Sequence, residues 1–249
     1  MTTADTQKQL GRDHLSLVLP VYNEAGIIEE VIRDYYSIVI KARPDTKLIV
    51  LEDGSDDGTK PILNRLHQEI PFTLISATDR KGYAKAFKDA LRTAQTPLIF
   101  FSDSDGQHNP RDVLRMLDQM YDSDILGGYK QPRRDPYYRR VLSKAYNKLF
   151  FILFGLKIKD INSGFKLIRK TVVDDILSDI QDMRYCVMSE FILKAFLSGY
   201  KIKEIRVDHF PRKHSDSNIF TPAKLPSIIV EVIKSLVRIK ITYRKDSNR

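Results

Sequence analysis

Short apolar runs alternate with segments of helical periodicity through the first half of the chain. The apolar runs predict strands over four ranges: Leu15–Tyr22, Leu48–Leu51, Phe72–Ala77 and Leu98–Phe101. Helical patterns follow the first three strands and end near Ala42, Ile70 and Gln95. Strands that alternate with helices predict an α/β fold, with a mostly parallel sheet covered on both faces. Ligands of such sheets bind beyond the carboxyl ends of the strands.

The second half of the chain is less regular. We expect a helix over 136–155, a strand over 163–169, a helix over 189–198, a strand over 201–209 and an amphipathic helix over 225–241. No internal repeat or clear second domain is present in the sequence. The predicted organisation is a polar tail (1–14), one domain (15–224) with halves 15–130 and 131–224, and a C-terminal helix with a basic tail (225–249).

The bulk composition suits one domain with a sizeable core, since 42% of the 249 residues are apolar. Cys186 is the one cysteine, so no disulfide forms within the chain and we expect a reducing, cytoplasmic compartment. The first dozen residues lack the apolar stretch of a signal peptide. The longest apolar run, Leu149–Phe154, is far shorter than the roughly 20 residues that span a bilayer. We therefore expect a protein that is soluble or peripheral to a membrane.

Much of the net charge of +9 lies in two clusters. The first cluster contains Asp135 as its single acid, and its basic residues are Lys130, Arg133, Arg134, Arg139, Arg140 and Lys144. The second contains Asp246, and its basic residues are Lys234, Arg238, Lys240, Arg244, Lys245 and Arg249. Such clusters attract nucleic acid, anionic lipid head groups or phosphorylated substrates. A solvated helix face is the alternative for the first cluster.

Acidic side chains follow the first, second and fourth predicted strands: Glu24, Glu52 with Asp53, and Asp103 with Asp105. Gln107 adds a neutral oxygen to the motif Asp103-x-Asp105. Oxygen ligands in this pattern suit Mg²⁺ or Mn²⁺, which bridge substrate phosphates. The alternative is a solvated turn, in which Asn109 caps a helix that starts near Pro110.

The turns after the first two strands also allow two interpretations. Asp53 could accept hydrogen bonds from a nucleoside, because carboxylates accept from N–H and hydroxyl donors. Turn chemistry with Thr59 as a helix cap explains the same segment. Tyr22 could flank a base and Glu24 could face the same crevice, or Asn23 could simply be a cap.

Four segments resemble the inverting glycosyltransferases of the GT-A fold (glycosyltransferase family 2): LPVYNEA at 19–25, EDGSDDGT at 52–59, KGYAKA at 81–86 and DSDGQH at 103–108. Three later segments resemble the polyprenyl-phosphate branch, typified by dolichol-phosphate mannose synthase: RRVLS at 139–143, DINSGF at 160–165 and RKHS at 212–215. The resemblance extends from about Leu15 to Leu236. It implies a Rossmann-like GT-A fold, with a nucleotide-sugar half before about 130 and an acceptor half after it. It also implies transfer of a hexose from a GDP- or UDP-linked donor to a dolichyl or undecaprenyl phosphate.

The resemblance also implies roles for individual residues. The nucleotide-sugar would be bound by Pro20, Tyr22, Glu24, Asp53, Lys81 and Asp103. The metal, Mg²⁺ or Mn²⁺, would be held by Asp103, Asp105 and Gln107. The acceptor phosphate would be bound by Lys130, Arg134, Arg139 and Ser143. The residues implied in catalysis are Asp105, Arg139, Arg212, which would contact donor or acceptor phosphates, and Glu190, which would face the sugar. Two departures are Glu52, where the family usually has Asp, and His214–Asn218, in place of a Gly-x-Ser-Lys loop.

A phosphate acceptor already carries a negative oxygen, so its transfer reaction needs no strong base, and arginines suit its recognition. The alternative is a saccharide or other soluble acceptor, which would need a base, with Glu190 as the candidate. A nucleic-acid-binding protein is disfavoured because acids gather at the strand ends, and an inactive binding module is disfavoured by the intact Asp103-x-Asp105-x-Gln107 set. We expect attachment to the cytoplasmic face of a membrane to be peripheral, or supplied by a membrane-protein partner.

Overall fold

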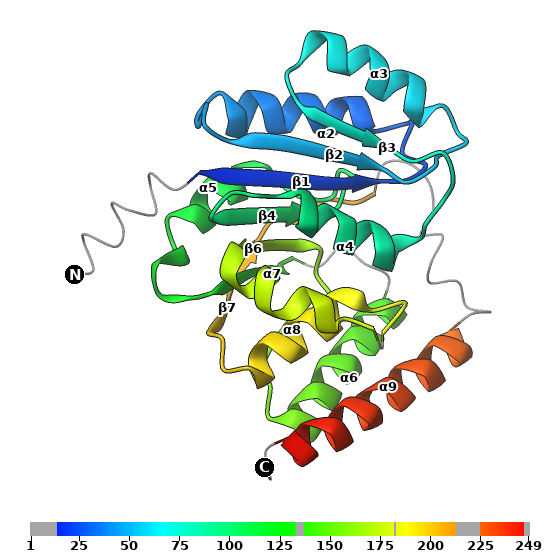
Figure 1. The fold of residues 1–249 in the computed structure, drawn as a ribbon, viewed down its shortest axis with the longest axis vertical. Coiled ribbons are helices and arrows are strands. Elements are labelled where there is room, and N and C mark those ends of the chain that lie inside the picture. Colours follow the sequence, from blue (N-terminus) through cyan, green and yellow to red (C-terminus); the bar gives the residue numbers. More distant parts are fainter. Residues whose placement is uncertain (1–13, 133–136, 182, 213–224, 247–249) are drawn as a thin grey trace.

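The computed structural model describes residues 14–132, 137–181, 183–212 and 225–246. Within these ranges one seven-stranded sheet runs through the molecule in the order β3-β2-β1-β4-β6-β5-β7 (Figure 1). The strands are β1 (Leu15–Val21), β2 (Lys47–Glu52), β3 (Thr73–Ser76), β4 (Leu98–Ser102), β5 (Ile125–Lys130), β6 (Phe165–Arg169) and β7 (Ile202–Val207). The predicted α/β class and mostly parallel sheet are confirmed.

The strand directions bring almost all carboxyl ends to one edge of the sheet. β1 is parallel to β2 and β4, and β2 is parallel to β3. β6 is antiparallel to both β4 and β5, and β7 is parallel to β5. β5 and β7 therefore point the same way as β1–β4, and only β6 among the described strands begins where the others end. Residues that follow β1, β2, β4, β5 and β7 meet at this edge, as do those that precede β6.

Helices cover both faces of the sheet. They are α2 (Ile28–Tyr35) with a π-helical turn (Tyr36–Ile40), α3 (Thr59–Glu69), α4 (Tyr83–Thr93), α5 (Arg111–Leu117), α6 (Tyr137–Phe154), α7 (Lys170–Ile176), α8 (Val187–Leu197) and α9 (Leu225–Asp246). Short 3₁₀ turns occupy Met120–Asp122 and Leu177–Asp179. The predicted helices and strands are present to within a few residues, whereas β5 and α7 were not predicted.

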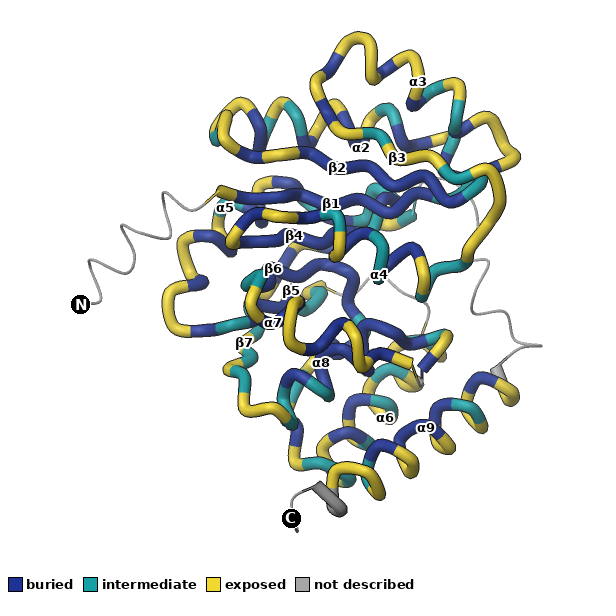
Figure 2. The backbone as a smooth tube through the Cα atoms, in the orientation of Figure 1, coloured by how far each residue is buried: buried dark blue, intermediate teal, exposed yellow. Residues whose placement is uncertain are grey.

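The side chains of successive strand residues point alternately into two separate apolar cores. Val18 and Phe101 pack into one core with residues of α4 and α8, while Leu17 and Phe100 pack into the other with residues of α2 and α5. This follows from the alternation of side chains along a strand, and it explains why β1 and β4 are apolar without interruption. Figure 2 shows the central strands buried throughout, in contrast to the edge strand β3.

The last helix packs on the same core. α6 and α9 lie together at the end of the molecule opposite α3 (Figure 1). α9 buries Ile228, Val232, Leu236 and Ile239 in the core that contains Phe150 of α6. Among the described residues, no helix is long and apolar enough to cross a membrane.

Candidate active site

The loop after β1 is fastened to the turn after β2. The backbone N–H of Asn23, a residue with a positive φ of 54°, donates to Ser55 Oγ at 3.0 Å. The Asn23 side chain donates to Asp56 Oδ1 at 2.7 Å and accepts from the Asp56 N–H at 3.1 Å. The backbone N–H of Glu24 donates to Thr59 Oγ1 at 3.0 Å. These bonds fix the direction in which the Glu24 carboxylate leaves the chain.

Asp53 organises the loop before α4. Its two carboxylate oxygens accept the backbone N–H groups of Lys81 at 2.8 Å and Gly82 at 2.9 Å. That loop carries Arg80, whose guanidinium carbon lies 4.0 Å from the centre of the Tyr22 ring. A carboxylate offers about four lone-pair positions, so these bonds leave acceptor capacity, and the nucleoside contact of Asp53 stays a prediction.

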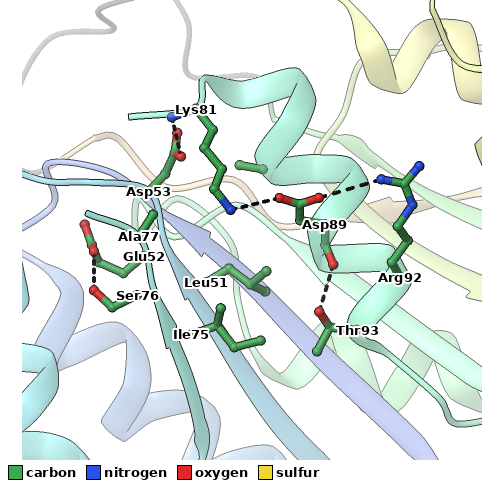
Figure 3. Close-up of a pocket in the computed structure, with 11 residues that line it drawn as sticks. Leu51, Glu52, Asp53, Ile75, Ser76, Ala77, Lys81, Asp89, Arg92 and Thr93 are labelled. Carbon is green, nitrogen blue, oxygen red and sulfur yellow. Dashed lines mark hydrogen bonds and ion pairs between the residues drawn. The ribbon is translucent and has the colours of Figure 1, made fainter. Parts of the chain in front are cut away.

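Glu52 accepts hydrogen bonds from the turn that follows it and from the neighbouring strand β3. Its carboxylate, almost fully buried, accepts the Ser76 hydroxyl at 2.6 Å and the backbone N–H of Ser55. Beside it, between β2, β3 and α4, lies a cavity of about 290 Å³ (Figure 3). The Lys81 ammonium borders this cavity and lies 3.2 Å from Asp89 Oδ2. The donor contact predicted for Lys81 is not tested by this arrangement.

Asp103, directly after β4, is held by the segment before β6 and by the first residue of α4. Its backbone N–H donates to the Gly164 carbonyl at 3.0 Å, and its Oδ1 accepts the Tyr83 hydroxyl at 3.3 Å. A Cβ at position 164 would lie 2.1 Å from Asp103 Oδ2, so only glycine fits beside this carboxylate. The next residue, Ser104, donates its hydroxyl to the Pro20 carbonyl at 2.7 Å and ties this loop to β1.

Asp105 and Gln107 lie in the same turn. Asp105 Oδ1 accepts the Gln107 backbone N–H at 3.1 Å. The Gln107 side-chain amide donates to the Phe210 carbonyl at 3.2 Å, beyond the end of β7. Asn109 Oδ1 accepts the backbone N–H of Arg111 at 3.1 Å, next to the acidic motif, although Pro110 and not the predicted Asn109 occupies the N-cap position of α5.

Burial raises the pKa of two carboxyl groups at this edge, and the nearby Asp105 carboxylate adds to both shifts. Burial, with a further contribution from Asp105, raises the pKa of Asp103 to about 6, although Lys130 opposes the shift. Burial raises the pKa of Glu24 to about 7, despite an ion pair in which Arg212 Nη2 lies 2.6 Å from Glu24 Oε1. Glu24, Asp103 and Asp105 thus form an acidic cluster that faces two cations, Arg212 and Lys130.

The donor set fits a hard divalent cation. No group of three His, Cys, Asp or Glu side chains in the described part of the chain is arranged to hold a metal alone. Asp103 and Asp105 would supply two carboxylates. The remaining ligands would then be water and diphosphate oxygens, as is usual for Mg²⁺ and Mn²⁺. The raised pKa of Asp103, to which the nearby Asp105 carboxylate contributes, is the condition that a cation relieves.

The predicted acceptor residues lie on or near α6. Lys130 ends β5, and its charge acts on Asp103. Arg139 and Ser143 are one turn apart on α6 and both are partly buried. Arg134 lies outside the described residues, as does the His214–Asn218 segment. The phosphate-binding roles of these residues stay predictions.

Glu190 is engaged by backbone groups. Its carboxylate accepts the N–H of Gln181 at 2.8 Å and of Met183 at 2.7 Å, and the Lys194 ammonium lies 2.9 Å away. Glu190 is 1% exposed. These contacts support the turn before α8, and the predicted position facing a sugar is not tested by them.

Three residues of this region were not predicted. Tyr83 and Arg80 flank the Lys81–Gly82 segment that carries part of the family resemblance, so that segment was the available signal. Lys166 on β6 is fully buried, and burial lowers its pKa against the opposing effect of nearby carboxylates, including Asp103. Its signal was a lysine between the apolar residues Phe165 and Leu167 of the strand.

A model of the family described as Glycosyl transferase family 2 matches residues 16–177. The chain belongs to this family. Polyprenol monophosphomannose synthase of Mycolicibacterium smegmatis is 29% identical over 236 residues, which cover 88% of this chain and 85% of the relative. Undecaprenyl-phosphate 4-deoxy-4-formamido-L-arabinose transferase of Pseudomonas syringae is 26% identical, over 88% of this chain and 64% of that relative.

Solved structures show the same fold. Glucosyl-3-phosphoglycerate synthase of Mycobacterium tuberculosis, in complex with Mn²⁺, UDP and phosphoglyceric acid, matches with a TM-score of 0.70 at 18% identity, over 94% of this chain and 82% of that one. Mannosyltransferase PcManGT of Pyrobaculum calidifontis, in complex with GDP-Man and Mn²⁺, matches with a TM-score of 0.60 at 20% identity, over 83% of this chain and 63% of that one. The GT-A fold of this family 2 glycosyltransferase is therefore shown.

Proposed function

We propose that this family 2 glycosyltransferase transfers a hexose from a GDP- or UDP-linked sugar to a polyprenyl phosphate, with inversion at C1 and with Mg²⁺ or Mn²⁺ bound. The relatives named above as polyprenol- and undecaprenyl-phosphate transferases support the acceptor class. The two solved structures that hold Mn²⁺ with a nucleotide or nucleotide-sugar support the metal and the donor class.

The observation that carries the proposal is the meeting of opposite charges at the carboxyl edge. The Asp105 carboxylate repels both Glu24 and Asp103 there, and the Arg212 guanidinium attracts both. Arg212 is bound to Glu24 through Nη2, yet its Nε is buried without a hydrogen-bond partner among the described residues. A buried N–H donor without an acceptor costs free energy, and a phosphate oxygen would satisfy it. Carboxylates for a cation and guanidinium donors for phosphate are the two requirements of a nucleotide-diphosphate site.

The chemistry then follows from the residues at hand. An oxygen of the acceptor phosphate attacks C1 of the sugar and forms the new C–O bond, while the bond from C1 to the donor diphosphate breaks. The nucleoside diphosphate leaves with the electron pair. A metal ion held by Asp103 and Asp105 would neutralise charge on the departing diphosphate. Arg212 stabilises the same charge by donating hydrogen bonds, and no proton has to be removed from the acceptor.

A transfer assay tests this proposal. Purified protein is incubated with Mg²⁺ or Mn²⁺, a panel of radiolabelled GDP- and UDP-sugars, and a polyprenyl phosphate in detergent. We expect label in the lipid fraction from one donor class, and loss of that label when the metal is chelated. Label that enters only a water-soluble acceptor would refute the lipid acceptor, and transfer that continues in chelator would refute the metal.

A further inference from the structure

The exposed apolar side chains of this protein are concentrated on two helices. Twelve of the fifteen large apolar side chains exposed in the described part of the chain belong to α6 and α9. Those of α6 are Tyr137, Tyr138, Val141, Leu142, Phe151 and Ile152, and those of α9 are Ile229, Val230, Ile233, Val237, Ile241 and Tyr243. Single exposed apolar residues are ordinary, whereas a concentration of them marks an interaction surface.

α9 carries two apolar stripes that point in different directions. Ile228, Val232, Leu236 and Ile239 form the stripe that packs into the core. A second stripe begins one position later and consists of Ile229, Ile233, Val237 and Ile241, each between 44% and 52% exposed. One position along a helix is a rotation of about 100°, so the second stripe lies on a different side of α9 from the first. Buried and exposed positions accordingly alternate along α9 in Figure 2.

The charges beside this surface are almost all positive. Exposed Lys234 and Arg238 follow Ile233 and Val237 directly along α9, and Glu231 is the one acid of α9 before Asp246. α6 contains no acidic residue, and its exposed basic residues are Arg140, Lys144 and Lys148. Apolar side chains interspersed with lysine and arginine suit the boundary between anionic head groups and acyl chains.

We propose that the outer faces of α6 and α9 dock on an anionic lipid bilayer. The Ile229–Ile241 stripe enters the boundary of the acyl chains, and the neighbouring lysines and arginines contact anionic head groups. This proposal deepens the proposed function, because α6 also carries Arg139 and Ser143 on its partly buried side. A membrane-borne acceptor phosphate would then meet the helix that is predicted to bind it.

Vesicles without any polyprenyl phosphate test the docking separately from the transfer reaction. We expect the full chain to co-sediment with phosphatidylcholine vesicles that contain about one third phosphatidylglycerol, more weakly with pure phosphatidylcholine, and less as salt increases. The variant Ile233→Glu with Val237→Glu should bind vesicles more weakly. Each lost side chain is about half exposed, so its loss should lower the partition coefficient roughly fivefold, and loss of the pair roughly 25-fold. Lys234→Gln with Arg238→Gln should remove most of the dependence on anionic lipid.

Tyr121→Glu is the matched control, since Tyr121 is an exposed apolar residue outside α6 and α9 and should leave vesicle binding unchanged. Circular dichroism checks that the variants fold. Three results would overturn the proposal: a wild-type chain that binds neither vesicle, equal binding by the Ile233→Glu, Val237→Glu variant, or a dimer that this variant dissociates while no vesicle binds. Vesicle binding by a chain that transfers no sugar would refute the proposed function alone.

Discussion

Replacement of Gly164 by alanine should disable Asp103 without unfolding the protein. The new Cβ would lie 2.1 Å from Asp103 Oδ2 and 2.3 Å from its Cγ. Non-bonded heavy atoms settle near 3.5 Å, so the carboxylate has to retreat by about 1 Å or more. A misplacement of that size in a reacting complex costs about 100-fold in rate. We therefore expect kcat/KM for sugar transfer to fall about 100-fold and Mn²⁺ binding, followed by electron paramagnetic resonance, to weaken.

The unfolding free energy should fall by only about 1–3 kcal/mol, the usual cost of overpacking, and urea unfolding measures it. Gly127→Ala is the matched control, because its Cβ comes no closer than 3.3 Å to the end of the flexible Lys166 side chain. The decisive comparison is a double-mutant cycle with Asp103→Ala. If Gly164 acts through Asp103, adding Gly164→Ala to Asp103→Ala lowers activity no further. Losses that simply multiply, or a Gly164→Ala enzyme of normal activity, would refute the reasoning.

Three further outcomes follow from the site. The pKa of Glu24 is raised to about 7, so the metal-free folded protein holds a proton that the unfolded chain releases near pH 4.5. The unfolding free energy of the protein should therefore fall by up to about 3 kcal/mol between pH 4.5 and 7.5. A urea-unfolding series in which Glu24→Gln shows the same fall would contradict this. Asp105→Ala should abolish metal-dependent turnover. It should not lower the melting temperature measured in chelator, because the substitution removes the repulsion between Asp105 and Asp103. Full retained activity would exclude Asp105 as a metal ligand. Glu52→Asp should cost about 1–2 kcal/mol in urea unfolding, because the shorter side chain cannot accept from both Ser55 and Ser76; unchanged stability would show that these bonds are unimportant.

The acidic edge could be predicted from the sequence because it depends on local signals. Each buried strand is an apolar run, and the first polar residues after it must emerge at the carboxyl edge of a parallel sheet. Glu24, Asp53 and Asp103 all follow such runs, so the structure brings them to the same edge. No long-range information was needed for this part of the site.

β5 was not predicted because contacts with other strands, and not its own sequence pattern, explain why these residues form a strand. Gly127 and Gly128 interrupt its apolar pattern, and glycine is rare in strands. In the structure a Cβ on Gly128 would lie 2.9 Å from the Val207 methyl carbons and 3.0 Å from the Phe165 ring. The glycine lets two strands and their side chains approach, and nothing within 125–130 reveals that neighbour. The reversed direction of β6 is hidden for a similar reason, since alternation along a strand is the same in both directions.

The hydrogen-bond partners of individual side chains also could not be predicted from the sequence. Glu52 belongs to one of the family segments and Glu190 to none of them. For neither residue can the sequence show that its carboxylate accepts backbone N–H groups, of Ser55 in one case and of Gln181 and Met183 in the other. Whether an acid faces a crevice or a loop depends on which loop folds back over it. Conversely, Tyr83 reaches Asp103 only because α4 begins beside the end of β4.

Burial of charge at the carboxyl edge costs the fold free energy, as the Glu24–Arg212 pair shows. A contact of 2.6 Å with a guanidinium would ordinarily lower the pKa of a carboxyl, yet the pKa of Glu24 is raised. Desolvation therefore outweighs the ion pair, as is common for buried charges. A cation beside Asp103 and Asp105 would remove part of that penalty, and a diphosphate would supply the acceptor that Arg212 Nε lacks among the described residues. Metal and nucleotide would each offset part of this desolvation cost, so together they should stabilise this chain more than their separate effects combined.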